Sequence, residues 1–113
     1  MAEIPRAKMS PRIENGIVYW YEGDTFELNL AIDLRDQDGG IVEPTDETAF
    51  EIIIRNERKE DVYSEKHYAA AGVTFACDEE VTKLFKKGKY RYDVNYYGEY
   101  KTSIAEDNIM IVE

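Results

Sequence analysis

The feature that most constrains the fold is a regular alternation of residue types between positions 26 and 34. Its apolar members are Phe26, Leu28, Leu30, Ile32 and Leu34, and its other members are Glu27, Asn29, Ala31 and Asp33. Successive side chains of a β-strand point to opposite faces, so these five apolar side chains would share one face. A helix would scatter them around its surface. The sequence therefore predicts a half-buried strand over 26–34.

Shorter segments with the same period occur on both sides of this strand. The other expected strands cover 17–21, 49–55, 62–68, 73–77 and 89–97, with one or two closing strands in 100–104 and 108–112. Turn residues separate them, including Asn15-Gly16 and the segment 35–40. Segment 62–68 alternates weakly and carries Glu65 and Lys66, which is typical of an edge strand. About seven short strands at this spacing predict an all-β, immunoglobulin-like β-sandwich.

One segment follows a helical period instead. Asp78 is a good N-cap residue, and Val81, Leu84 and Phe85 have the spacing of one helix face. Gly88 follows a run of lysines and is expected to end the segment. We therefore expect a short helix over about 78–87, before the penultimate strand.

The chain has 113 residues, which fits a single domain. Pro5 and Pro11 disfavour strand pairing near the N-terminus. These residues predict a flexible N-terminal arm over 1–11 and a sandwich domain over 12–113.

Charge and composition disfavour several classes of partner. The formal net charge is −10, and a chain this acidic is repelled by phosphate backbones and anionic membranes. No apolar run is long enough to span a bilayer, and the N-terminus lacks the apolar stretch of a signal peptide. We expect no nucleic-acid or membrane partner, and synthesis in the cytoplasm without a leader.

The residues that could carry chemistry are few. His67 is the only histidine and lies in the weak strand, where we expect a lone surface histidine. Cys77 is the only cysteine and continues the inward face of its strand, which favours a buried thiol. The turn Asp36–Gly40 resembles the start of a calcium loop, but Pro44 fits that motif badly, so weak calcium binding stays an open alternative to a simple turn. We expect no catalytic, metal or cofactor site, and no enzyme activity.

The most informative candidate surface is aromatic. In the strand that includes Tyr19, Trp20 and Tyr21, Trp20 points to the opposite side from the two tyrosines. At least one large ring would therefore face outward unless another layer covers it. Ile53 breaks the alternation of its own strand and would also need a cover. These four residues, with the N-terminal arm, are the candidate partner contact.

Two longer motifs resemble a known family. They are Trp20-Tyr21-Glu22-Gly23-Asp24-Thr25-Phe26, followed by the alternating strand, and Leu84-Phe85-Lys86-Lys87-Gly88-Lys89-Tyr90-Arg91-Tyr92-Asp93-Val94. Together they resemble the N-terminal immunoglobulin-like domain of phage baseplate upper proteins and related tail or prophage proteins of Gram-positive bacteria. The resemblance covers roughly 13–113. It implies a virion module that docks into a multi-subunit assembly.

The sequence thus favours a non-catalytic phage or prophage structural or adaptor protein of the tail or baseplate. It would act through protein–protein contacts with other virion proteins or with itself, by burying aromatic anchors or by adding a strand at an exposed edge. The alternative is a carbohydrate-binding sandwich module that uses Trp20 and outward tyrosines. A small enzyme or metal protein is a third, weaker reading.

Overall fold

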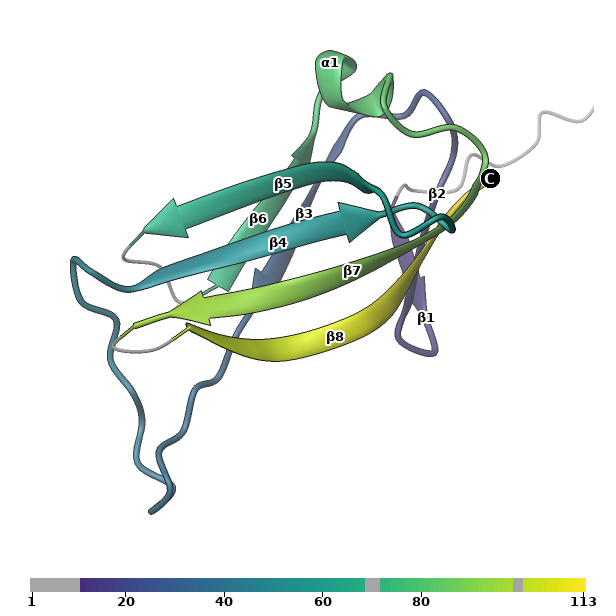
Figure 1. The fold of residues 1–113 in the computed structure, drawn as a ribbon. Coiled ribbons are helices and arrows are strands. Elements are labelled where there is room, and N and C mark those ends of the chain that lie inside the picture. The colour runs from purple at the N-terminus through teal and green to yellow at the C-terminus, as the bar shows by residue number, and fades with distance from the viewer. Residues whose placement is uncertain (1–10, 69–71, 99–100) are drawn as a thin grey trace, which may run out of the picture.

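The computed structural model describes residues 11–68, 72–98 and 101–113. These residues form eight strands in two sheets, with one short helix (Figure 1). The elements are β1 (Arg12–Glu14), β2 (Ile17–Trp20), β3 (Phe26–Ala31), β4 (Ala49–Arg55), β5 (Asp61–Tyr68), β6 (Gly72–Cys77), α1 (Glu79–Thr82), β7 (Gly88–Tyr97) and β8 (Lys101–Val112). The all-β prediction is confirmed, and the predicted arm lies outside the described residues except for residue 11.

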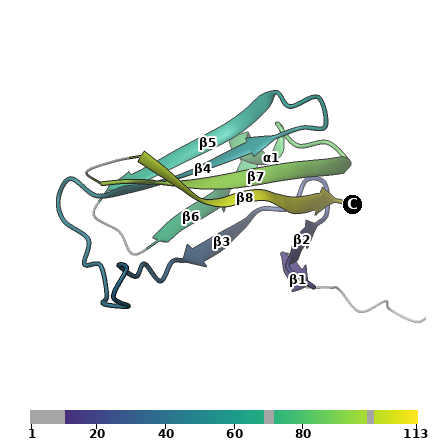
Figure 2. The same cartoon turned by 60° about the horizontal axis from the view of Figure 1, so that its bottom comes forward.

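The strand order is that of an immunoglobulin-like sandwich. The larger sheet has the order β1-β2-β8-β7-β4-β5, and the smaller sheet pairs β3 with β6. Only β2 and β8 run parallel, and the smaller sheet lies across the core from the larger one (Figure 2). In immunoglobulin terms β3 and β6 are strands B and E, and β4, β5, β7 and β8 are strands C, C′, F and G. The predicted fold class is therefore observed.

A tyrosine corner supports this assignment. The Tyr90 hydroxyl, near the start of β7, donates to the Lys86 carbonyl at 2.9 Å and accepts from the Lys86 amide at 3.0 Å. Immunoglobulin-like domains place such a tyrosine at the start of strand F, two residues before a cysteine. Here Tyr92 occupies that later position and is buried. The core is therefore held by packing where antibody domains use a disulfide.

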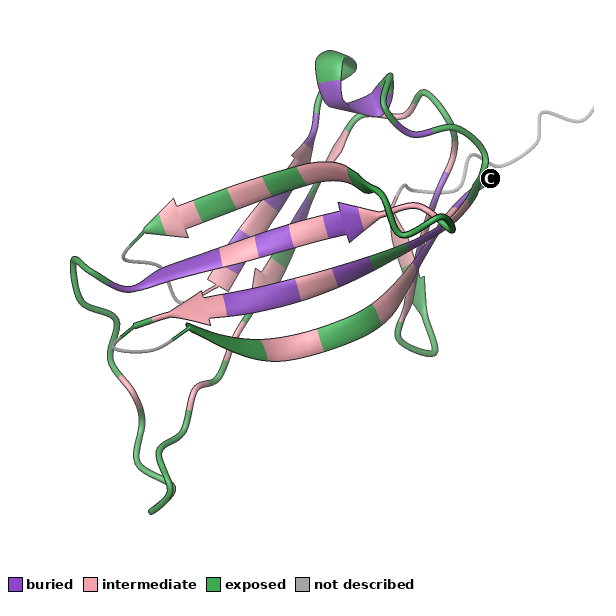
Figure 3. Cartoon of the chain, viewed as in Figure 1, coloured by how far each residue is buried: buried purple, intermediate pink, exposed green. Residues whose placement is uncertain are grey.

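The core lies between the two sheets and is rich in aromatic rings. The ring of Phe75 lies 5.6–6.3 Å from the rings of Trp20, Phe26, Tyr63 and Phe85. Aromatic pairs at such distances each contribute about 0.5–1.5 kcal/mol beyond area burial. Burial is concentrated in β4 and β7, at the centre of the larger sheet (Figure 3). The inward faces predicted for both strands are the observed ones.

The larger sheet has one strand more at its edge than the prediction gave. Residues 12–14 form β1, which pairs with β2 around the turn at Asn15 and Gly16. Both turn residues have positive φ, as a tight hairpin requires. The two closing segments form one strand, β8, with register shifts where β7 passes Val94. The weak segment 61–68 is an edge strand, as expected.

The helix is shorter than predicted. The Asp78 side chain caps it, accepting from the Glu80 and Val81 amides at 3.0 and 2.9 Å. After residue 82 the amides of Leu84 and Phe85 bond to carbonyls three residues back, which tightens the turn. Phe85 therefore enters the core, whereas Leu84 is 49% exposed. The prediction that Leu84 shares the buried face is wrong for this reason. None of the helices in the described ranges is long and apolar enough to cross a membrane.

The long predicted strand 26–34 is also shorter. The described ladder with β6 runs as far as the pair of Ala31 and Gly72, and residues 69–71 lie outside the described part of the chain. A Cβ at Gly72 would lie 2.1 Å from the Leu30 carbonyl oxygen, so the close approach of the two strands requires glycine. Beyond Ala31 the alternation continues, and Ile32 and Leu34 still pack against the core.

Candidate functional site

The predicted aromatic contact is largely internal. Trp20 is 1% exposed, with its ring 5.2 Å from Phe26 and 5.7 Å from Phe85. It therefore anchors the core and cannot serve as an outward contact. The expectation that Trp20 belongs to the contact surface is wrong, because the smaller sheet covers the side of β2 to which its side chain points.

The remaining predicted contacts do not form one surface. Tyr19 and Tyr21 are half-buried, and the Arg12 guanidinium lies 4.6 Å above the Tyr19 ring. Ile53 is half-buried on the outer face of β4. Two strands, β8 and β7, separate β2 from β4, and Tyr19 lies level with Lys89 of β7 whereas Ile53 lies level with Asp93, so the two residues are more than roughly 14 Å apart at ordinary strand spacing. They can contact one partner only if it covers much of this face.

The two free edges of the smaller sheet differ in how they are covered. An immunoglobulin sandwich of constant type pairs strand A with B and strand D with E. Within the described residues neither β3 nor β6 has such a second partner. Each strand therefore has one edge whose backbone groups must be satisfied in another way.

Side chains of β5 cover the free edge of β6. Glu65 Oε1 accepts from the Ala76 amide at 3.1 Å and from the Tyr63 hydroxyl at 2.5 Å. His67 Nε2 lies 3.0 Å from both Glu65 Oε2 and the Thr74 carbonyl oxygen, so this nitrogen carries a hydrogen. We call Tyr63, Glu65 and His67 the β5 clamp.

The clamp has two consequences for the expected chemistry. The His67 side chain is 38% exposed, so it lies at the surface as predicted, but its ring is bonded to Glu65 and to β6 and does not stand alone. Burial and the hydrogen bond to Glu65 raise the pKa of Tyr63. The Tyr63 hydroxyl therefore keeps its proton at neutral pH and can donate to Glu65.

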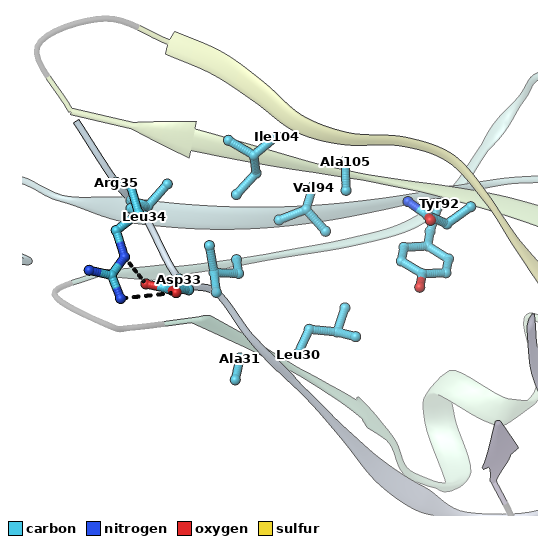
Figure 4. Close-up of a pocket in the computed structure, with 11 residues that line it drawn as sticks. Leu30, Ala31, Asp33, Leu34, Arg35, Tyr92, Val94, Ile104 and Ala105 are labelled. Carbon is cyan, nitrogen blue, oxygen red and sulfur yellow. Dashed lines mark hydrogen bonds and ion pairs between the residues drawn. The ribbon is translucent and has the colours of Figure 1, made fainter. Parts of the chain in front are cut away.

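The free edge of β3 has no such cover among the described side chains. Beside it lies a groove of about 490 Å³ between β3 and its extension on one side and β7 and β8 on the other (Figure 4). The groove is mainly apolar, and its lining includes Leu30, Ile32, Leu34, Tyr92, Val94 and Ile104. Figure 4 shows Leu30 beneath Val94 and Ile104, with Asp33 and Arg35 at one mouth. Among the described residues, none occupies the position of strand A beside this apolar groove.

The extension of β3 has free space on its other side as well. A second cavity of about 130 Å³ adjoins Ile32, Asp33 and Leu34 from the side of Phe50 and Tyr96. Residues 32–34 belong to no strand, and within the described residues their one backbone–backbone hydrogen bond is that from the Val42 amide to the Leu34 carbonyl, at 3.1 Å. Along this stretch a further strand could pair without displacing one already present.

Sequence reasoning missed the groove, although one signal pointed to it. The alternation extends to Leu34, whereas the described pairing with β6 ends at Ala31, so Ile32 and Leu34 have no partner residue in β6. That mismatch becomes visible only when β6 is known to start at Gly72.

The other chemical candidates serve the fold. Cys77 is buried, and burial raises the pKa of its thiol, so the expected buried cysteine is confirmed. Asp36 Oδ1 accepts from the Asp38 and Gly40 amides at 2.9 and 2.8 Å, so the segment 36–40 is a turn organised by its own aspartate. In the parts of the chain that the structure describes, no three His, Cys, Asp or Glu side chains are grouped as a metal site would need.

The structure also shows a cluster around Lys66 that was not predicted. The ammonium of Lys66 lies 4.0 Å above the Tyr97 ring and 5.4 Å from that of Tyr68, and the Tyr97 hydroxyl donates to Glu51 at 2.7 Å. The Tyr97 pKa is raised, mainly because of that hydrogen bond. The cluster faces away from the groove, on the outer side of the larger sheet.

No family model matches the chain, and neither the curated proteins nor the solved structures yielded a match.

Proposed function

We propose that this protein is a non-catalytic structural or adaptor protein of a phage or prophage tail or baseplate, which holds partner proteins by accepting a strand. The observation that carries the proposal is the edge of β3 that no described residue covers, beside an apolar groove of about 490 Å³. An exposed strand edge recognises extended peptides through main-chain hydrogen bonds, while pockets beside it select alternate side chains. The phage context comes from the resemblance of the two sequence motifs.

A binding role also fits the use of the reactive residues. The thiol of Cys77 is buried, and His67 is engaged with Glu65 and the β6 backbone. Both residues stabilise the sandwich in these positions. The accessible features of the described residues include the backbone edge of β3 and the apolar groove beside it, which suit contacts with another protein.

Particle fractionation tests the proposal. Particles released from the source bacterium after prophage induction are separated on a density gradient, and the protein is detected by antibody. We expect it to sediment with tail proteins and to remain bound after washing in high salt. Recovery only in the soluble fraction at the top of the gradient, while tail proteins sediment, would contradict the proposal.

The carbohydrate-binding alternative is weakened by the burial of its main ring. Stacking on a sugar needs an exposed aromatic face, and Trp20 does not provide one. Tyr68 is 64% exposed and is the ring on which this alternative would now depend. Specific binding on a glycan array that is lost in Tyr68→Ala would favour the alternative over strand acceptance.

A further inference from the structure

The alternation of β3 defines what an added strand would meet. A strand paired along the free edge would place its inward side chains beside Leu28, Leu30 and Ile32, over the groove. Its outward side chains would lie beside Glu27, Asn29, Ala31 and Asp33, all of which are exposed. The inward positions therefore require apolar residues, and the outward positions meet two carboxylates.

The surroundings of the edge are strongly acidic. Between residues 27 and 47 the chain has seven acidic residues and one basic residue, Arg35. The acidic residues are Glu27, Asp33, Asp36, Asp38, Glu43, Asp46 and Glu47. Arg35 pairs with Asp33 at 3.0 Å, but both side chains are largely exposed, and such pairs are easily exchanged. The edge thus attracts positive charge.

A second copy of this chain fits the edge badly. An antiparallel pairing of two β3 strands centred on Leu30 gives the fullest overlap of 27–33. That register sets Glu27 of one copy directly opposite Asp33 of the other, twice. Like charges opposite each other in a ladder are destabilising, and each copy also carries a net charge of −10.

We propose that the β3 edge binds an extended segment of another protein in which apolar residues alternate with lysine or arginine. This inference rests on the proposed function and specifies the partner. The apolar residues fill the groove along Leu30, Ile32 and Val94, and the basic residues pair with Glu27 and Asp33 on the outer face. Backbone hydrogen bonds to the free edge fix the register.

Synthetic peptides test this specificity on the full chain. The probe alternates valine with lysine and is long enough to cover residues 26–34. One control peptide has the same composition with its valines and lysines in separate blocks, and another replaces each lysine with glutamate. Binding is measured by fluorescence anisotropy, and its location by changes in the amide NMR spectrum.

Charge reversal supplies the matched variants. Glu27→Lys combined with Asp33→Lys changes two exposed residues at the edge, and Glu57→Lys combined with Glu60→Lys changes two exposed residues in the β4–β5 turn by the same charge. We expect the edge variant to bind the lysine peptide about tenfold more weakly and the glutamate peptide more tightly. The turn variant should keep the preference for lysine.

Each other outcome overturns the inference. Equal affinity for the alternating and block peptides would mean attraction by charge alone. Amide changes confined to residues outside β3, β7 and β8 would show that the peptide binds elsewhere, and an absence of binding would rule out the acceptor edge. If sedimentation velocity instead detects a dimer that becomes more stable in the edge variant, that result would assign the edge to a second copy. NOE contacts between residues 1–10 and β3 would assign the edge to the chain itself. Sedimentation of the protein with virions does not depend on any of these results, so the virion location and the specificity of the β3 edge fail separately.

Discussion

Replacing Glu65 by alanine tests the clamp that distinguishes the two edges of the smaller sheet. The Glu65 carboxylate accepts from the Ala76 amide, the Tyr63 hydroxyl and His67 Nε2, at 2.5–3.1 Å. Its side chain is 14% exposed, so water replaces it only in part. Glu65→Ala therefore leaves a backbone amide and a hydroxyl without their acceptor.

The expected cost follows from these contacts. A hydrogen bond to a charged group contributes about 1.5–3 kcal/mol, and His67 keeps the Thr74 carbonyl as a partner. Counting mainly the Ala76 amide and the Tyr63 hydroxyl, with some rescue by water, we expect a loss of about 2–3 kcal/mol. That is a large fraction of the roughly 5–15 kcal/mol typical of a domain.

Urea denaturation measures this loss as a shift of the midpoint at constant slope. Glu65→Gln retains an acceptor oxygen and should lose about half as much. Ser64→Ala, on the exposed opposite side of β5, is the matched control and should change stability by less than about 0.5 kcal/mol. A Glu65→Ala protein as stable as the Ser64→Ala protein would refute the clamp.

Three further measurements address the core. Cys77 should resist a thiol reagent at neutral pH until the protein is unfolded, because its thiol is buried and its pKa is raised; fast labelling of the native protein would contradict this. Trp20→Ala should lower the free energy of unfolding by about 3–5 kcal/mol. The fluorescence of native Trp20 should be blue-shifted and poorly quenched by acrylamide, whereas strong quenching would place the ring at the surface. Tyr90→Phe should cost about 1–2 kcal/mol in urea denaturation by removing both bonds to Lys86, and an unchanged midpoint would show that the tyrosine corner is dispensable.

The local patterns in the sequence were enough to predict most strands. Buried residues alternate with more exposed ones in β4, at Phe50, Ile52 and Ile54, and in β7, at Tyr90, Tyr92 and Val94. Each strand turns one face toward the core, so every second residue is apolar and the sequence shows a period of two. The N-cap at Asp78 was equally clear, since a single side chain satisfies two nearby amides.

What the sequence could not predict depends on contacts between distant segments. Trp20 alternates with Tyr19 and Tyr21, and the period does not say which side is inside; the smaller sheet decides it by covering Trp20. The clamp joins Glu65 to Ala76, and the groove joins Leu30 to Ile104. No local pattern specifies such pairs, because each depends on which strands become neighbours.

Within the described part of the chain the free edge of β3 is open, whereas side chains of β5 close that of β6. Residue-resolved amide hydrogen exchange, followed by NMR, tests it most directly. Antiparallel pairing on one side leaves every second amide of β3 pointing away from β6. We predict fast exchange at these alternate amides, slow exchange at Ala76, and slow exchange throughout the central part of β7, which has strands on both sides. Uniformly slow exchange along β3 would contradict the claim, because it would show that the edge is already covered.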